Sequence, residues 1–299
     1  MKMKIPIIFL LILFSQIVSA QDIRLAGIEY FNYPKAPVND NGENYKSSFQ
    51  ELGAFAAYPK QSKNKKTIVV NGIQYALIET SVTNNATAIT NDRDFHLIAY
   101  NFSIIQKLNN NWKLAATLSP TLASDFKSKL SGDDFFMQGS FIAIKKLSDY
   151  TSIGAGVTYT TKLGQPLWLP ALHFRYYKNR HKLNMLLPSI VDYAYQLDQK
   201  DKLNAGFRAS LNGANFHVTD NNINSSVDVN KLRYSRINLG PLISYKISKM
   251  IMLEATGGIS TARKYQFLDV QGNKYSFNSN SVGFFNIGLA IVPPVFKEN

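Results

Sequence analysis

The 299-residue sequence contains no cysteine. This absence excludes disulfide bonds, thiolate metal ligands, a thiol nucleophile and a lipid-modified cysteine anchor. Histidine is also scarce, and the four histidines lack the close spacing that is typical of metal enzymes. No glycine-rich phosphate loop lies between a strand pattern and a helix pattern. We therefore expect no metal and no other cofactor.

Long hydrophobic runs are missing after the N-terminus, which excludes transmembrane helices. At the N-terminus, Lys2 and Lys4 precede the apolar run 5–14, and Val18-Ser19-Ala20 supplies small residues for a signal peptidase. This run is short for a membrane anchor, because a spanning helix needs about 20 apolar residues. The pattern predicts a signal peptide at residues 1–20 and one exported domain at residues 21–299.

Acidic residues are few, with 20 Asp and Glu against 33 Lys and Arg. The net charge is +13 for the whole sequence and +11 without the predicted signal peptide. This excess indicates contact with anions such as lipid phosphate or small anionic solutes. Export makes nucleic acid an unsuitable partner. The alternative is a basic surface with no specific anion.

Apolar and small polar residues alternate along much of the chain. In the stretch 152–177, Ile153 and Val157 interleave with Gly154, Gly156 and Thr158. The same period of two recurs in 98–104, 112–119, 203–212, 251–260 and 285–291. A period of two is that of a β-strand with one apolar face. The sequence therefore predicts an all-β fold.

Strand length and the chemistry of the polar face separate a membrane barrel from a soluble β-sandwich. Strands of soluble sheets usually have about five or six residues, whereas several of these patterns run to a dozen. The polar face is rich in Gly, Ser, Thr and Asn, where a soluble sheet would show Lys and Glu. A strand in hydrocarbon also needs every backbone group paired, which only a closed barrel provides. We predict a closed antiparallel transmembrane up-and-down β-barrel whose apolar face meets lipid.

The lengths of the connections predict the topology. Short connections fall at 109–111, 148–149, 179–180, 199–200 and 248–249, and long ones at 34–45, 80–92, 125–133, 217–230 and 266–281. Outer-membrane barrels place short turns in the periplasm and long loops outside. Two short turns follow each other unless "LNMLLPSIVDYAYQL" forms two short strands with a turn at Pro188 and Ser189. The count is then about 14 strands, with 12 as the alternative.

Three prolines fall within predicted strands. Pro120, Pro170 and Pro241 each lack the N–H group that a ladder hydrogen bond requires. We expect them at rims or bulges of the barrel.

Four segments carry a family resemblance: "IRLAGIEYFNYP", "FQELGAFAAYP", "LNMLLPS" and "INLGPLISYKISKMIMLEATGGISTARKYQF". With these, the chain resembles the DUF6268-type family of outer-membrane β-barrels from Gram-negative, Bacteroidota-like bacteria. The resemblance implies location in the cell outer membrane, contact with outer-membrane lipid and lipopolysaccharide, and insertion by the barrel-assembly machinery. It supplies no catalytic residues.

Strand parity places a set of charged residues inside the barrel: Lys113, His173, Arg175, Arg208, Arg236 and Glu254. Four fixed cations against one acid would make a lumen that favours anions. Alternatively, these residues pair with one another and stiffen a filled interior. The leading hypothesis is a passive, porin-like conduit or a structural barrel with a basic polar lumen and no enzymatic activity.

Two other functions remain as alternatives. The first is an outer-membrane lipid-modifying hydrolase, for which parity allows His173 beside Ser152 or Ser210, although no spacing marks such a site. The second is a soluble exported β-protein that binds ligands through its loops.

Overall fold

The computed structural model describes residues 24–40, 43–219 and 228–293. The predicted signal peptide, residues 1–20, lies outside this part of the chain. The described residues form one sheet and a short 3-10 helix, η2, at Gly132–Asp134. The strands are β1 Ala26–Asp40, β2 Glu43–Gln61, β3 Thr67–Asn84, β4 Thr90–Lys107, β5 Trp112–Ser124, β6 Phe135–Lys146, β7 Thr151–Thr160, β8 Leu167–Lys178, β9 His181–Leu187, β10 Ile190–Gln196, β11 Leu203–His217, β12 Val229–Lys246, β13 Ile251–Asp269, β14 Lys274–Ser279 and β15 Val282–Ile291.

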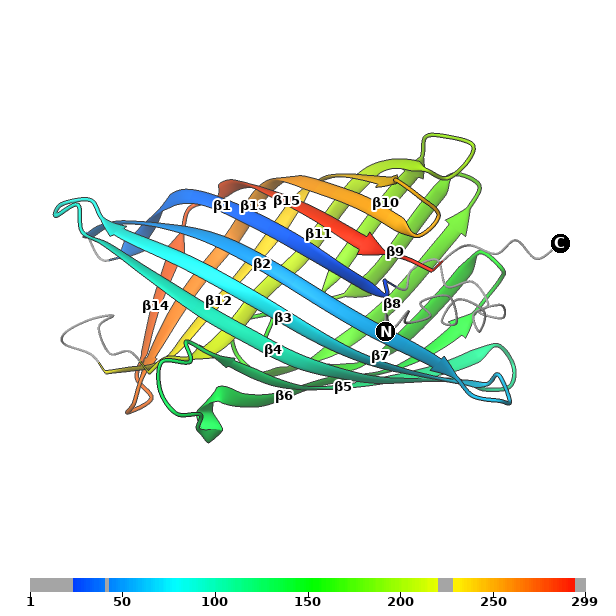
Figure 1. Ribbon diagram of the computed structural model, residues 1–299, viewed down its shortest axis with the longest axis horizontal. Coiled ribbons are helices and arrows are strands. Elements are labelled where there is room, and N and C mark those ends of the chain that lie inside the picture. The colour runs from blue at the N-terminus through cyan, green and yellow to red at the C-terminus, as the bar shows by residue number, and fades with distance from the viewer. Residues whose placement is uncertain (1–23, 41–42, 220–227, 294–299) are drawn as a thin grey trace, which may run out of the picture.

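The sheet closes on itself as a barrel (Figure 1). From β1 to β13, each strand pairs antiparallel with the next. β14 pairs with the far half of β13 and β15 with its near half, so these two form one barrel strand that is interrupted at Asn280 and Ser281. Both also pair with β1, which completes the ring. The protein is therefore a closed antiparallel barrel of 14 strands, as the sequence predicts, and the turn predicted at Pro188 and Ser189 joins β9 to β10.

Several predicted long loops are wrong. Residues 34–45, 80–92 and 266–281 mostly continue the strands as long hairpins, because their backbones keep pairing beyond the apolar belt. The predicted loop at 125–133 is present between β5 and β6 and leads into η2. The predicted loop at 217–230 lies partly outside the described residues. The hairpin end of the barrel is taken as the outer end, because the opposite end carries the short turns.

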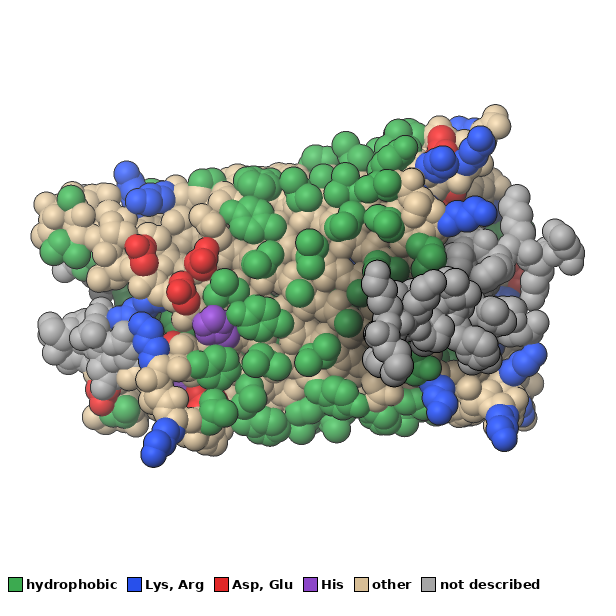
Figure 2. Space-filling model, in the orientation of Figure 1, with side chains coloured by type: hydrophobic (Ala, Val, Ile, Leu, Met, Phe, Trp, Pro, Cys, Tyr) green, Lys and Arg blue, Asp and Glu red, His purple; other side chains and the backbone are tan. Residues whose placement is uncertain are grey.

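A belt of apolar side chains surrounds the middle of the barrel (Figure 2). Its exposed members include Ile28, Leu52, Ile73, Ile98, Leu118, Phe141, Val157, Trp168, Leu172, Phe207, Ile243, Phe285 and Ile287. Lys, Arg, Asp and Glu gather at the two ends of the molecule in the same view. No second sheet covers this belt in the described structure. A soluble β-sandwich is therefore not the fold, and the belt matches the hydrocarbon layer of a bilayer.

No helix in the described part of the chain has the length and apolarity to cross a membrane.

The barrel wall is uneven in height. Strands β7 to β10 do not reach the outer end of the barrel. β9 ends at Leu187, opposite Leu172 in the middle of β8. Pro170 therefore lies beyond the end of β9 and needs no hydrogen bond on that side. Above the low strands, β5 and β11 meet directly in a parallel bridge between Ser124 and His217. The outer part of the barrel is consequently narrower than the part near the short turns.

The other two prolines occupy gaps in the ladder. The pairing of β4 with β5 is interrupted at Pro120, and that of β12 with β13 is interrupted at Pro241, with the same register on both sides of each gap. The expectation of rims or bulges is wrong for these two prolines, since each lies within a strand whose pairing resumes in the same register beyond the gap.

Candidate functional site

The structure places all six predicted lumen residues on the inner face of the barrel, on the side opposite the exposed apolar belt. Lys113 lies on β5, His173 and Arg175 on β8, Arg208 on β11, Arg236 on β12 and Glu254 on β13. They do not form a single cluster. Arg208 and Glu254 belong to an ion-pair network near the inner end, Lys113 and Arg175 to a separate basic wall, and Arg236 to the narrow outer part.

The ion-pair network neutralises Arg208. Its guanidinium donates to both carboxylate oxygens of Asp192, at 2.7 and 2.8 Å, and to Oε1 of Glu254 at 3.1 Å. Glu254 also pairs with Arg24, which precedes β1. Nearby, Asp201 pairs with Lys182 and Lys246. These contacts match the sequence alternative in which lumen charges pair and stiffen the interior.

A cavity of about 170 Å³ opens within this network. Its lining combines both signs of charge and includes Arg24, Lys182, Asp192, Asp201, Arg208, Lys246 and Glu254. Sequence parity named Arg208 and Glu254 and omitted their partners Asp192 and Arg24. Asp192 sits on one of the two short strands, whose alternation is too brief to assign a face from sequence.

The basic wall lies across the lumen, on β4 to β8. The charges that act on Lys113 come from Lys107, Arg175 and Lys146, which are all cations. Lys107 pairs directly with Lys113 in the ladder. Lys146 also forms an ion pair with Asp149 at 2.6 Å. This side of the inner lumen therefore carries a surplus of positive charge, unlike the network around Arg208.

Buried aromatic side chains cross the narrow outer part of the lumen. We call this layer the septum, and its members are Tyr33, Phe49, Ile78, Phe95, Phe216, Tyr234, Tyr265 and Phe284. Rings from strands that are not neighbours meet there. Phe49 on β2 stacks on Tyr265 on β13 with centroids 5.1 Å apart, and Phe95 on β4 lies 5.1 Å from Phe216 on β11. The septum thus closes the lumen with side chains rather than with backbone.

Arg236 is the charged centre of the septum. It is 1 % exposed, and its guanidinium lies 3.6 Å from the ring centroid of Tyr33. It pairs with Glu51 on β2, which is not a neighbour of β12 in the sheet, and Glu51 also accepts hydrogen bonds from Asn212 at 3.1 Å and from the Tyr234 hydroxyl at 2.9 Å. These bonds tie β11 and β12 to β2 through the lumen.

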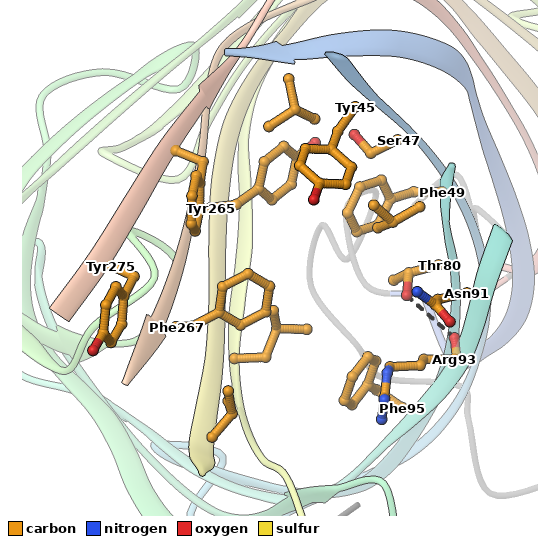
Figure 3. A pocket seen from close by; sticks show the side chains of 15 residues that line it. Tyr45, Ser47, Phe49, Thr80, Asn91, Arg93, Phe95, Tyr265, Phe267 and Tyr275 are labelled. Atoms are coloured by element: carbon orange, nitrogen blue, oxygen red, sulfur yellow. Dashed lines mark hydrogen bonds between the residues drawn. The ribbon is translucent and has the colours of Figure 1, made fainter. Parts of the chain in front are cut away.

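Above the septum lies a cavity of about 280 Å³, which we call the outer cavity. Rings and aliphatic side chains from β1 to β4 and β12 to β14 point into it (Figure 3). Its lining includes Val38, Tyr45, Ser47, Phe49, Val82, Arg93, Phe95, Leu232, Tyr265, Phe267, Tyr275 and Phe277. Such a cavity, mostly apolar with a few polar groups, is the usual form of a small-molecule site.

Along two strands, the apolar side chains move from the outer face to the inner face where the outer cavity begins. Sequence reasoning missed this change. On β2, Leu52 faces outward while Phe49 is buried inside, and on β4, Ile98 faces outward while Phe95 is buried inside. The two residues of each pair are three positions apart, so they lie on opposite faces of the strand. The apolar side chains therefore switch from the outer to the inner face along one strand. This switch is the sequence signal that marks where a strand leaves the membrane.

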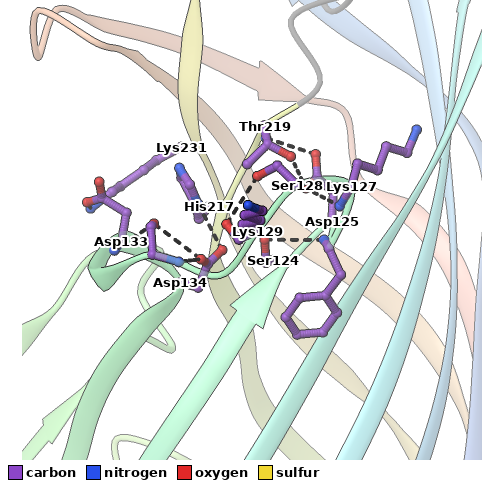
Figure 4. Close-up of polar contacts among 12 residues, drawn as sticks. Ser124, Asp125, Lys127, Ser128, Lys129, Asp133, Asp134, His217, Thr219 and Lys231 are labelled. Atoms are coloured by element: carbon purple, nitrogen blue, oxygen red, sulfur yellow. Dashed lines mark hydrogen bonds and ion pairs between the residues drawn. The ribbon is translucent and has the colours of Figure 1, made fainter.

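A polar junction holds β5 against β11 at the outer end (Figure 4). His217 Nδ1 lies 2.8 Å from Asp134 Oδ1, and Asp125 accepts hydrogen bonds from the backbone and hydroxyl of Thr219 at 2.9 and 2.7 Å. Burial acts to raise the pKa of Asp134. Hydrogen bonds from Ser124, the Ser131 backbone and His217 outweigh burial and hold that pKa below its ordinary value.

The serine and histidine considered for hydrolysis are partly brought together. Ser152 Oγ lies 3.1 Å from His173 Nε2 across β7 and β8. Ser210 instead lies opposite Ile190 in the pairing of β10 with β11. Among the described residues, no group of three or more His, Asp or Glu side chains is arranged to hold a metal ion.

Closed pairing, an apolar belt and a lumen that contains the charged residues define an outer-membrane type of β-barrel. The DUF6268 model, described as a domain of unknown function, matches residues 13–291. The chain therefore belongs to the DUF6268 family.

Solved structures share the barrel at low identity. The COG4313 outer membrane channel from Pseudomonas putida F1 is 12 % identical, with a TM-score of 0.43 over 92 % of this chain and 99 % of the other. The Pseudomonas putida toluene transporter TodX is 12 % identical, with a TM-score of 0.38 over 90 % and 89 %. LpxR from Salmonella typhimurium is 8 % identical, with a TM-score of 0.33 over 90 % and 100 %. No curated protein matches the sequence.

Proposed function

We propose that this protein is a gated passive conduit of the outer membrane. The observation that carries the proposal is a pair of cavities in the lumen, one on either side of a septum made of side chains. Their volumes are about 280 and 170 Å³. A change of rotamer moves a side chain without breaking the hydrogen bonds of the sheet. A solute can therefore pass if the rings of the septum rotate aside.

The proposed solutes are small anions. The basic wall brings Lys107, Lys146 and Arg175 close to Lys113, and such a group of cations favours negative charge in the inner lumen. The proposal also includes the setting: the outer membrane of a Gram-negative, Bacteroidota-like bacterium, with lipid and lipopolysaccharide against the belt and insertion by the barrel-assembly machinery.

Ion selectivity in planar bilayers tests the conduit. We expect the purified protein to form channels that prefer chloride over potassium, and the double variant Lys113→Gln, Arg175→Gln to lose that preference. The matched control is Lys145→Gln, Lys264→Gln, which removes two charges that lie outside the lumen, one of them over the ring of Trp112. Bilayers that stay silent, or a cation preference that neither variant changes, would contradict the proposal.

Lipid hydrolysis is the second candidate, and one contact favours it. The hydrogen bond between Ser152 and His173 is the first element of a serine nucleophile with a base. The test incubates liposomes of bacterial lipid with purified protein and measures released fatty acid by mass spectrometry. Release that disappears in His173→Ala and persists in the control His181→Ala would establish hydrolysis. No release from the unaltered protein would end this candidate.

A further inference from the structure

We propose that the outer cavity is a binding site for a small amphipathic anion, with an apolar or aromatic body and a single acidic group. The proposal extends the proposed conduit function. It rests on that function only for the statement that the bound molecule then passes inward. The binding itself follows from the buried cations beneath the cavity, the hydroxyls in its wall and its aromatic lining.

Two arginines lie side by side beneath the outer cavity. Arg263 on β13 and Arg236 on β12 are 2 % and 1 % exposed, and each acts electrostatically on the other. Arg263 is two residues from Tyr265, which lines the cavity, and its guanidinium lies 5.8 Å from the centroid of that ring. Arg236 lies 5.1 Å from the ring of Phe49, another lining residue. Both guanidiniums are thus within one layer of side chains of the cavity.

These guanidiniums retain hydrogen-bond donors that nothing in the described structure accepts. Nε and Nη2 of Arg263 are buried without a partner, and its Nη1 donates to the Asn280 carbonyl at 3.1 Å. Nη1 of Arg236 is also buried without a partner. Buried donors of charged groups normally have acceptors, because desolvation without compensation is costly. An acceptor from a ligand would satisfy them.

The charge at this level is not balanced. Glu51 is the carboxylate that contacts Arg236, and it already accepts hydrogen bonds from Arg236, Tyr234 and Asn212. These three bonds hold the Glu51 carboxylate at Arg236, on one side of the septum. Arg263 donates to a carbonyl oxygen, and no carboxylate in the described part of the chain forms an ion pair with it. The site thus favours one additional negative charge.

The wall of the cavity contributes two further free hydroxyls. The Tyr265 hydroxyl and Ser47 Oγ both belong to lining residues, are buried, and have no hydrogen-bond partner among the described residues. They come from β13 and β2, which are separated in the sheet by β1 and by the strand that β14 and β15 form. A carboxylate placed between them and Arg263 would accept hydrogen bonds from several directions, as buried carboxylates require.

The rest of the lining selects the body of the ligand. Phe49, Phe95, Phe267, Tyr275 and Phe277 offer ring faces and edges, which favour a flat or apolar group. The volume of about 280 Å³ accommodates a molecule of one or two rings. An inorganic anion would leave the space between these rings empty, and a neutral hydrocarbon would leave the guanidinium donors without acceptors.

The test measures binding to the full chain in lipid nanodiscs by isothermal titration, with empty nanodiscs subtracted. The probes are 2-naphthoate, its neutral analogue 2-naphthalenemethanol, and acetate. We expect naphthoate to bind at least about tenfold more tightly than the other two probes. Arg263→Gln should abolish this preference and leave naphthalenemethanol binding unchanged. The matched control Lys264→Gln removes the next charge along β13, on the outer face, and should behave as the unaltered protein.

Equal affinity of the unaltered protein for naphthoate and naphthalenemethanol would overturn the proposal, as would an Arg263→Gln protein that keeps the preference. If Arg263→Gln does not fold, as judged by the absence of heat-modifiable gel mobility, Arg263→Lys retains the charge and should retain the preference. Binding without any channel activity would refute the conduit and leave this site standing. Channel activity with no naphthoate binding would refute the site alone.

Discussion

Ser124 at the end of β5 pairs with His217 at the end of β11, although β6 to β10 separate these strands in the sheet. The bridge is parallel, while the pairs along the ring are antiparallel. It forms because β6 pairs with β5 only as far as Leu122 and β10 pairs with β11 only as far as Ser210, which leaves one edge of each strand open at its outer end. The polar junction of His217 with Asp134 and of Thr219 with Asp125 fixes this closure.

The first prediction concerns His217. Replacing it with Ala removes the hydrogen bond to Asp134 and should destabilise the junction by about 1–3 kcal/mol, without affecting the ladder in the membrane. Hydrogen exchange of the amides of residues 124–134 should speed up. His181→Ala is the control, since its bond to Tyr193 at 2.9 Å lies far from the junction. Unchanged exchange in His217→Ala would show that backbone pairing alone closes the outer end.

The second prediction concerns acid. Because the pKa of folded Asp134 is lower than the ordinary 3.8, its ionised form stabilises the junction above that pH. The contribution is lost as the pH falls through the folded pKa, below 3.8. Protection of the amides of residues 124–134 against exchange should therefore be greatest above pH 3.8 and fall as the pH is lowered through the folded pKa. Asp134→Asn should show fast exchange at every pH, whereas Asp133→Asn, which alters an exposed neighbour, should keep the acid transition. A junction whose protection stays constant as the pH is lowered until Asp134 is protonated would be evidence against this role.

The third prediction concerns the buried pair in the septum. Glu51→Gln leaves the Arg236 charge buried without its partner, which should cost about 3–5 kcal/mol of unfolding free energy. Urea unfolding followed by gel mobility measures the loss. Replacing both residues, as Glu51→Leu with Arg236→Met, should recover most of it. Glu79→Gln, an exposed position on the adjacent strand, serves as the control. A double variant as unstable as the single one would mean that the pair does more than neutralise itself.

The fourth prediction concerns the septum as a gate. Phe49→Ala with Tyr265→Ala removes a ring stack across the lumen and should raise single-channel conductance, at a cost of about 3–5 kcal/mol in stability for each ring. The comparison is Tyr30→Ala with Phe285→Ala, a ring pair 6.0 Å apart on the outside of the barrel. That variant should keep the original conductance. If the septum variant conducts no better, another constriction closes the lumen.

Particular residues show where sequence reasoning succeeded. Ile153 and Val157 are exposed on the belt, while Gly154 and Gly156 lie so close to the neighbouring strand that an added side chain would meet the backbone or side chains of β6. The period of two fixed these faces because a strand in a membrane has lipid on one side along its whole span. The turn at Pro188 and Ser189 followed from the alternation of short and long connections, which otherwise fails between residues 179 and 199.

Other parts of the site could not be read from the sequence. The Asn, Ser and Lys content of 34–45, 80–92 and 266–281 is typical of loops, yet these segments pair as hairpins because neighbours at the same height supply the hydrogen bonds. Likewise, Glu51 and Arg236 are 185 positions apart, and only closure of the barrel brings them together.

The sequence by itself determined three features of this protein: long strands with one apolar face, an even number of strands, and an interior that contains charged groups. Local alternation suffices for that, because each strand meets the same two environments. Tertiary structure decided which interior charges neutralise each other, where aromatic side chains turn inward to form the septum, and how β5 reaches β11. These features depend on contacts across the lumen, which the height and closure of the wall set and which no single strand encodes.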